Sequence, residues 1–163
     1  MDNEITSYLQ WIEELRRQVT QIVTDLPTAA LNWRPVASEA DHATNSLAVL
    51  AAHTAGAEHY WIYEVVGRQA ATRDRPAEFV TVATTAAALV ARLAQTGQET
   101  AQIFATLTAD SLNQTRTIGA RTFTVRWCIM HVIEHTALHL GHMQLTRQLW
   151  HETQTDPCKF GGR

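Results

Sequence analysis

Residues 127–142 read WCIMHVIEHTALHLGH and contain four of the eight histidines of the chain. In an α-helix each residue advances by about 100°, so these four histidines fall on one stripe of the helix surface. Leu138, Leu145 and Leu149 lie on the same side, which predicts that the stripe faces the protein interior. A buried row of imidazoles is costly unless its ring nitrogens are satisfied, and a metal ion would satisfy them. The histidines of this row are His131, His135, His139 and His142.

The spacing along the helix limits which of these histidines can share one ion. His131 and His139 lie about 12 Å apart along a helix axis, whereas a Zn–N bond spans only about 2.0–2.1 Å. An i,i+4 pair can bind one ion, so either His131 and His135 or His135 and His139 could supply two ligands. A third ligand is expected from another helix. His142 is equally compatible with a polar position beside the metal and with the protein surface.

The rest of the chain has the apolar periodicity of amphipathic helices. Apolar residues recur at three- and four-residue steps over 5–26 and again over about 80–107. A further helix is predicted to end near residue 67, with Asn45 or Ser46 as its N-terminal cap. Together with the histidine helix, these segments make four long helices, each with one apolar face.

Three connections separate the predicted helices. Segments 28–45 and 68–77 contain proline and polar residues, and 28–45 is expected to cross over the bundle. Residues 110–122 are rich in Thr, Asn and Gly, and 115–123 could form a short hairpin. Four amphipathic helices without a convincing strand predict an all-α fold. We expect a four-helix bundle with long crossover connections, formed by a single domain over residues 1–163.

Bundles commonly bind metals between facing helices, and this selects further candidate residues. His53 and Glu64 fall on the predicted inward stripe of the second helix, so His53 could supply the third ligand. Glu64 is a candidate for the pocket, although an ion pair suits it better than the role of a base. We expect the same for Glu134, with a salt bridge to another helix. Trp61 and Trp127 are expected in the core or in a pocket wall.

The composition limits the possible partners. The chain has 13 Lys and Arg against 16 Asp and Glu, without a basic block, which argues against nucleic-acid binding. No apolar run reaches the ~18 residues of a membrane span, and residues 1–4 lack the basic start of a signal peptide. Two cysteines without motif spacing indicate no disulfide framework, and Cys128 is expected to fill core space. We therefore predict a cytoplasmic protein that acts on a small molecule, without nucleic-acid or membrane partners.

The chain resembles the DinB/YfiT-like superfamily, which contains metal-dependent hydrolases and thiol-dependent transferases. The similarity extends over nearly the whole chain and includes the motifs LNWRP at 31–35, AHTAGAE at 52–58, RDRPAEF at 73–79 and HLGH at 139–142. In this superfamily a divalent metal is bound by one histidine of the second helix and an HxxxH pair of the last, typically followed by x-Gly-Gln. The resemblance implies that His53, His135 and His139 bind a divalent metal, Zn²⁺ or Ni²⁺. His142 stands where the superfamily usually has glutamine.

The resemblance also implies a function. Three neutral histidines leave such an ion with open positions and its full charge, which is typical of catalytic rather than structural sites. Members of the superfamily use the ion to activate a low-molecular-weight thiol, which suggests an S-transferase with a thiol cosubstrate. Activation of water for hydrolysis is the second enzymatic hypothesis. A metal-stabilised binding module without catalysis is the competing class, so whether the chain is an enzyme stays open at this point.

A homodimer is predicted as well, because members of the superfamily often pair through helix faces. The chain has aromatic residues that such a contact could use, among them Trp11, Trp150 and Phe160.

Overall fold

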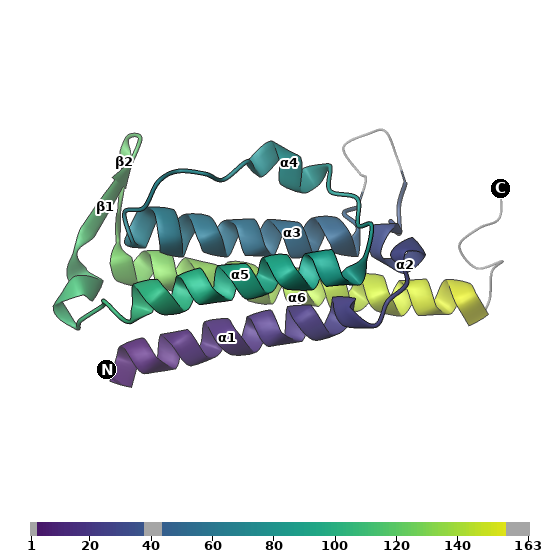
Figure 1. Cartoon of the computed structure of the whole chain (residues 1–163), viewed down its shortest axis with the longest axis horizontal. Coiled ribbons are helices and arrows are strands. Elements are labelled where there is room, and N and C mark those ends of the chain that lie inside the picture. The colour runs from purple at the N-terminus through teal and green to yellow at the C-terminus, as the bar shows by residue number, and fades with distance from the viewer. Residues whose placement is uncertain (1–2, 38–43, 156–163) are drawn as a thin grey trace.

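A computed structural model describes residues 3–37 and 44–155, and within these residues four long helical segments form a bundle (Figure 1). Helix α1 packs against α5 and α6, and α3 packs against the same two helices. The all-α bundle predicted from the apolar periodicity is therefore confirmed. The four segments are α1 (Asn3–Thr24), α3 (Leu47–Glu58) with its π-helical continuation η1 (His59–Val66), α5 (Ala86–Phe104) and α6 (Val125–Thr155).

The long crossover lies between α3 and α5. Figure 1 shows that residues 67–85, which include the short helix α4 (Arg75–Phe79), run back along the length of the bundle. Helices α3 and α5 are consequently parallel, and α1 and α6 run in the opposite direction. Helix α1 ends, and α3 begins, at the same end of the bundle, where α2 (Thr28–Asn32) also lies. The prediction that segment 28–45 crosses over was wrong, because its two ends are already neighbours.

Side-chain caps fix the starts of two helices that carry the histidines. Ser46 Oγ accepts a hydrogen bond from the backbone N–H of Val49 at 3.3 Å, which caps α3. Thr124 Oγ1 accepts one from the N–H of Trp127 at 3.1 Å, at the first turn of α6. Each cap satisfies a backbone donor that has no partner within its helix. The Ser46 cap was one of the two alternatives predicted from the sequence.

Helix α5 begins later than its periodicity suggested. Thr85 Oγ1 accepts a hydrogen bond from the N–H of Ala88 at 3.2 Å, so the first helical residue is Ala86. Val80 and Val82, which were predicted to start this helix, are 75% and 72% exposed. Their spacing imitates an inward face, but they belong to the connection from α4.

A β-hairpin joins α5 to α6. Strands β1 (Thr115–Ile118) and β2 (Arg121–Thr124) are antiparallel, with the first residue of β1 opposite the last residue of β2. Gly119, at the turn, has a φ of +58°, which glycine adopts without strain. The Arg116 guanidinium donates hydrogen bonds to two carbonyls at the C-terminal end of η1, which anchors the hairpin. The prediction that the chain contains no convincing strand was wrong, and the alternative prediction of a short hairpin at 115–123 is confirmed.

The interior contains Cys128, as predicted. Its side chain is fully buried among apolar residues of α1, η1, α5 and α6, and burial raises the pKa of the thiol to about 11. Because the thiolate is the reactive form of cysteine, burial and the raised pKa both suppress reaction with electrophiles.

We predict that Cys128 resists alkylation in the folded protein. In a Cys158→Ser variant at about pH 8, iodoacetamide is expected to leave the mass of the native chain unchanged, because only a very small fraction of a thiol with this pKa is ionised. The rate should rise as the pH increases toward the raised pKa. Mass spectrometry after denaturation should detect one modified cysteine, whereas rapid modification under native conditions would contradict the packing of Cys128.

Two predictions about partners, the homodimer and the lack of a membrane span, concern the surface and the helices. Trp11 is 59% exposed, whereas Trp150 packs edge-on against Trp33 with ring centroids 5.8 Å apart. Phe160 lies outside the described residues. The homodimer stays a prediction. None of the helices within 3–37 and 44–155 is both long and apolar enough to cross a membrane.

Candidate metal centre

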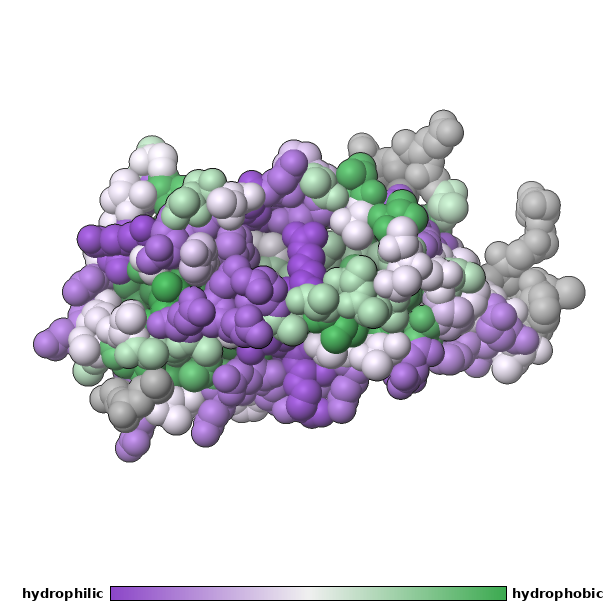
Figure 2. All heavy atoms as spheres, in the orientation of Figure 1, coloured by the Kyte–Doolittle hydropathy of each residue, from purple (hydrophilic) through white to green (hydrophobic). Residues whose placement is uncertain are grey.

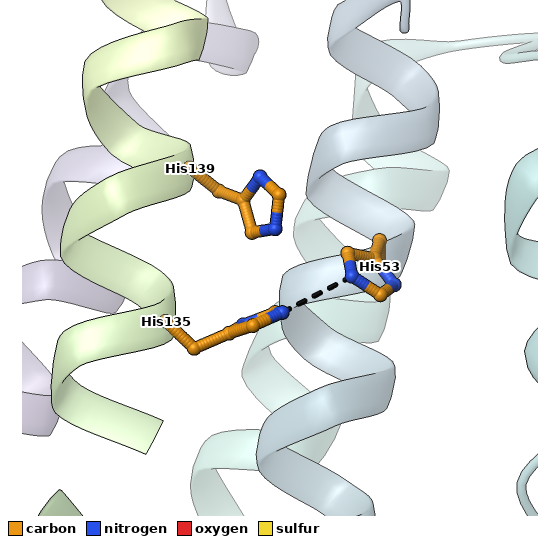
Figure 3. A group of neighbouring side chains, drawn as sticks. All are labelled: His53, His135 and His139. Carbon is orange, nitrogen blue, oxygen red and sulfur yellow. Dashed lines mark hydrogen bonds between the residues drawn. The ribbon is translucent and has the colours of Figure 1, made fainter. Parts of the chain in front are cut away.

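Three histidines from two helices converge in the space between α3 and α6. His53 extends from α3, and His135 and His139 extend from successive turns of α6 (Figure 3). One ring nitrogen from each of them lies within 4.8 Å of the others. The Nε2 atoms of His53 and His135 are 3.1 Å apart, a separation that two ligands at about 2.0–2.1 Å from one ion can have. These three side chains could therefore hold a metal ion.

The second nitrogens of these rings test whether the site suits a metal. His53 Nδ1 lies 2.8 Å from Glu78 Oε2, and His139 Nδ1 lies 3.4 Å from His142 Nδ1. A ring that donates its Nδ1–H to a carboxylate has a lone pair at Nε2, which is how metal-binding histidines are commonly oriented. His135 Nδ1 is buried and has no hydrogen-bond partner within the described part of the chain. The donor set of the three rings thus fits a cation between them.

The protonation of the two α6 histidines also suits a metal. Burial, helped by the neighbouring His139 and His53 rings, lowers the pKa of His135 to about 3. Burial and the His53 ring lower the pKa of His139 to about 4. Both imidazoles are consequently neutral near neutral pH, and the neutral imidazole is the form that binds metals.

A buried carboxylate orients His53. Glu78, on α4, is 0% exposed, and its two oxygens accept hydrogen bonds from Arg73 Nε at 2.7 Å and Arg73 Nη2 at 2.9 Å. Burial alone would raise the pKa of Glu78, but the hydrogen bonds from Arg73 and His53 hold this pKa below its ordinary value. Glu78 is therefore ionised and accepts the Nδ1–H of His53. The crossover connection in this way completes a site whose histidines belong to α3 and α6.

Glycine at position 56 makes room for this carboxylate. A Cβ atom at Gly56 would overlap Oε1 and Cδ of Glu78. Gly56 follows His53 by three residues, so the two lie on the same face of α3. The Glu78 carboxylate packs against the backbone at Gly56.

Sequence reasoning missed the roles of Arg73 and Glu78. Arg73 lies in segment 68–77, which was interpreted as a connection, and Glu78 directly follows that segment. A signal was present: Asp74 followed by Pro76 is typical of a helix start. Asp74 Oδ1 does accept a hydrogen bond from the N–H of Ala77 at 3.1 Å. Recognising this cap would have placed Glu78 on a helix.

The other aromatic candidates form a wall beside the centre, toward the hairpin. His131 stacks on Trp127, with ring centroids 4.9 Å apart and planes inclined by 10°. Trp61 packs edge-on against both rings, and Phe123 of β2 stacks on Trp127 at 4.4 Å. His131 does not belong to the group of three converging histidines.

The predicted inward stripe of α6 requires a correction. Leu138 and Leu145 are 58% and 54% exposed, so the side that they mark does not face the interior. The buried face of α6 instead includes Val132, Thr136 and Met143, centred about a quarter of a turn from the histidine row. The row lies on the flank of the helix, where its two central histidines are half-buried against α3. His142, at the end of the row, is exposed.

The two glutamates considered as candidates do not belong to the group of three converging histidines. Glu64 is buried, and its Oε1 accepts hydrogen bonds from the backbone N–H groups of Thr72 at 2.6 Å and Arg73 at 2.7 Å. It therefore fixes the start of the crossover connection. Glu134 is exposed, and its ion pair within the described residues is with His131 of the same helix at 3.8 Å. The prediction that Glu134 bridges to another helix was wrong.

Two cavities lie near the centre and differ in character. One, of about 450 Å³, includes His139 and His142 in its lining and is otherwise largely apolar. The other, of about 340 Å³, lies between α3, α5 and the crossover connection and is lined by charged residues such as Arg73, Arg92 and Glu99. Hydrophilic residues also predominate across the middle of the face that carries α5 (Figure 2). None of the three converging histidines lines the second cavity.

The fold and the site define a class of protein: a helical bundle with a three-histidine candidate metal centre between two of its helices. The chain matches the model of the mycothiol-S-transferase family over residues 7–151. It belongs to that family, which is a member of the DinB-like superfamily, so the resemblance found in the sequence is confirmed.

Comparison with solved structures supports the fold. The crystal structure of a conserved protein from Enterococcus faecalis is similar with a TM-score of 0.68 and 16% sequence identity. The similarity covers 91% of this chain and 97% of that chain. A comparison with curated proteins gave no significant match.

Proposed function

We propose that this protein is a metal-dependent S-transferase, which joins the sulfur of a low-molecular-weight thiol to an electrophilic carbon of a second small molecule. The observation that carries the proposal is the convergence of His53, His135 and His139 in a chain of the mycothiol-S-transferase family. A divalent ion, Zn²⁺ or Ni²⁺, held by these three side chains would lower the pKa of a thiol beside it, so that thiolate forms near neutral pH.

The side chains around the histidines have supporting roles in this proposal. Glu78 accepts the Nδ1–H of His53 and directs its Nε2 toward the space between the helices. Arg73 keeps Glu78 ionised through two hydrogen bonds. His142, 3.4 Å from His139, occupies the corresponding position beside the second nitrogen of that ring. The site is thereby organised before any substrate arrives.

The described residues offer no dedicated nucleophile at the site, which favours an external one, a thiol or water. Among the described residues, the cysteine is Cys128, which is fully buried in the core with a raised pKa. The transferred sulfur must then come from a cosubstrate. In the overall reaction the S–H bond of the thiol and the bond between the acceptor carbon and its leaving group break, and a new S–C bond forms. The proton and the leaving group pass to solvent. With a strained-ring acceptor, the opened ring oxygen takes the proton instead.

Product analysis tests this proposal. We expect metal-loaded protein incubated with mycothiol and a small alkyl epoxide to form the thioether faster than the thiol and epoxide do alone. A chelator should abolish the excess rate, and Zn²⁺ or Ni²⁺ should restore it. Mass spectrometry distinguishes the alternatives, because hydrolysis would give the diol without consuming thiol. A rate equal to the uncatalysed reaction with every thiol tested would favour a binding module without catalysis.

A further inference from the structure

We infer that the cavity beside His139 binds the acceptor molecule and selects acceptors that are neutral and apolar around the reactive carbon. This inference rests on the proposed S-transferase function, which it extends to the class of the second substrate. The cavity, of about 450 Å³, has the size of a typical small-molecule site. It adjoins the candidate metal centre through His139, one of the three converging histidines, and His142 lines it as well.

The lining of the cavity determines the chemistry of its ligand. Apolar side chains dominate it, including Leu50 from α3 and Leu145 and Leu149 from α6. Among the described residues that line it, none is Asp, Glu, Lys or Arg. A charged ligand would lose its hydration there without gaining a partner, which is strongly unfavourable. Asn45 and Thr146 offer a few polar atoms, enough to orient one carbonyl or ring oxygen.

The second cavity provides a contrast within the same molecule. Its lining includes Arg73, Asp74, Arg92 and Glu99 and none of the three converging histidines. The chain therefore places its charged side chains around one cavity and apolar side chains around the one that adjoins His139. The apolar character beside the candidate metal centre is a local property of that cavity.

Two exposed side chains at the cavity fit a bound apolar molecule. Leu145 is 54% exposed and Val36 is 47% exposed, although both are apolar and both line the cavity. An apolar ligand would remove this surface from water, which is the main driving force for binding such molecules.

In the transfer step, the thiolate sulfur would form its bond to the acceptor carbon at the His139 side. The electron pair of the broken bond would leave on the leaving group or on the opened ring oxygen, which then takes a proton from water.

A pair of leucine variants tests the inference. Leu145→Glu places a charge in the cavity, whereas Leu138→Glu places the same charge on an equally exposed leucine of α6 outside it. Binding of the neutral dye N-phenyl-1-naphthylamine to metal-loaded protein is followed by fluorescence, with a neutral alkyl epoxide as competitor. We expect Leu145→Glu to weaken dye binding by at least about tenfold and Leu138→Glu to leave it unchanged. Metal content should be the same in both variants.

Kinetics separates a failure of this inference from a failure of the proposed function. We expect Leu145→Glu to raise the KM for the epoxide by about tenfold without changing the KM for the thiol. Transfer that is equally efficient in both variants would overturn the cavity assignment and leave the S-transferase function standing. Loss of dye binding in Leu145→Glu without S-transfer by the unmodified protein would overturn the acceptor role and support only a site for neutral apolar ligands. Efficient transfer to an anionic acceptor such as iodoacetate would overturn the selectivity.

Discussion

Replacing His53 and His135 together by alanine is expected to reduce the bound metal from about one ion per chain to almost none, and to abolish S-transfer. This double substitution removes two of the three converging rings, those whose Nε2 atoms are 3.1 Å apart. Of the three converging histidines only His139 would then remain, and one ligand does not hold an ion. His53→Ala by itself should lower the metal content in the same direction, because the helix α3 ligand is lost.

The bundle should stay folded in these variants, because its apolar core does not depend on the centre. Fully buried side chains from different helices, such as Ile5, Phe104 and Ile129, pack away from the three histidines. Elemental analysis and circular dichroism of the purified variants measure both quantities. His131→Ala is the matched control, since His131 belongs to the same row of α6 but not to the converging group. Full metal occupancy in the double variant would refute the assignment, and complete unfolding on chelation would indicate a structural metal.

The second large effect, on metal affinity and on stability, is expected from Gly56→Ala, which adds a single methyl group. Gly56→Ala would place a Cβ atom where Glu78 Oε1 and Cδ now lie, so the carboxylate must move away from His53. Loss of such an orienting partner typically reduces metal affinity by about 10–100-fold. Because the side chain is also forced into a filled space, the variant should lose about 1–3 kcal/mol of unfolding free energy.

Gly141→Ala is the matched control for this prediction. A Cβ atom at Gly141 would meet nothing within 4 Å, and this glycine lies on the same helix as His135 and His139. Since alanine favours helices over glycine by about 1 kcal/mol, Gly141→Ala should increase stability slightly and leave metal affinity unchanged. Metal titration by calorimetry and thermal unfolding give the two readouts. Equal metal affinity in the two glycine variants would show that Glu78 does not orient His53.

Much of the fold was predictable, because its four helices have apolar residues at helical spacing. Helical spacing left two i,i+4 pairs open on the last helix and placed His53 on the inward stripe of the second. The resemblance then selected His135 and His139 from these pairs, and the three histidines do converge. The role of Glu78 was not predictable from periodicity. It lies 25 residues from its partner His53 and approaches from a crossover connection, and helical spacing gives no information about such contacts.

Local departures from regular helices account for the other misses. Glu64 was placed on the stripe of His53 by assuming one continuous α-helix, but α3 becomes a π-helix at His59. The wider turn changes which way each side chain points, so Glu64 contacts Thr72 and His59 rather than the three converging histidines. Leu138 and Leu145 misled the interpretation of α6 because exposed leucines there imitate a core face. For Leu145, the cavity beside His139 gives a reason to be apolar at the surface.

The absorption spectrum of the cobalt-substituted protein, recorded while a low-molecular-weight thiol is added, tests the central claim most directly. Cobalt(II) at a three-histidine site with an open position is expected to gain an absorption band from sulfur ligation, more strongly as rising pH favours loss of the thiol proton. A His135→Ala variant, which cannot hold the ion, should show no such band. If no cellular thiol changes the cobalt spectrum at any pH at which the protein stays folded, the centre does not activate thiols and the proposed function is wrong.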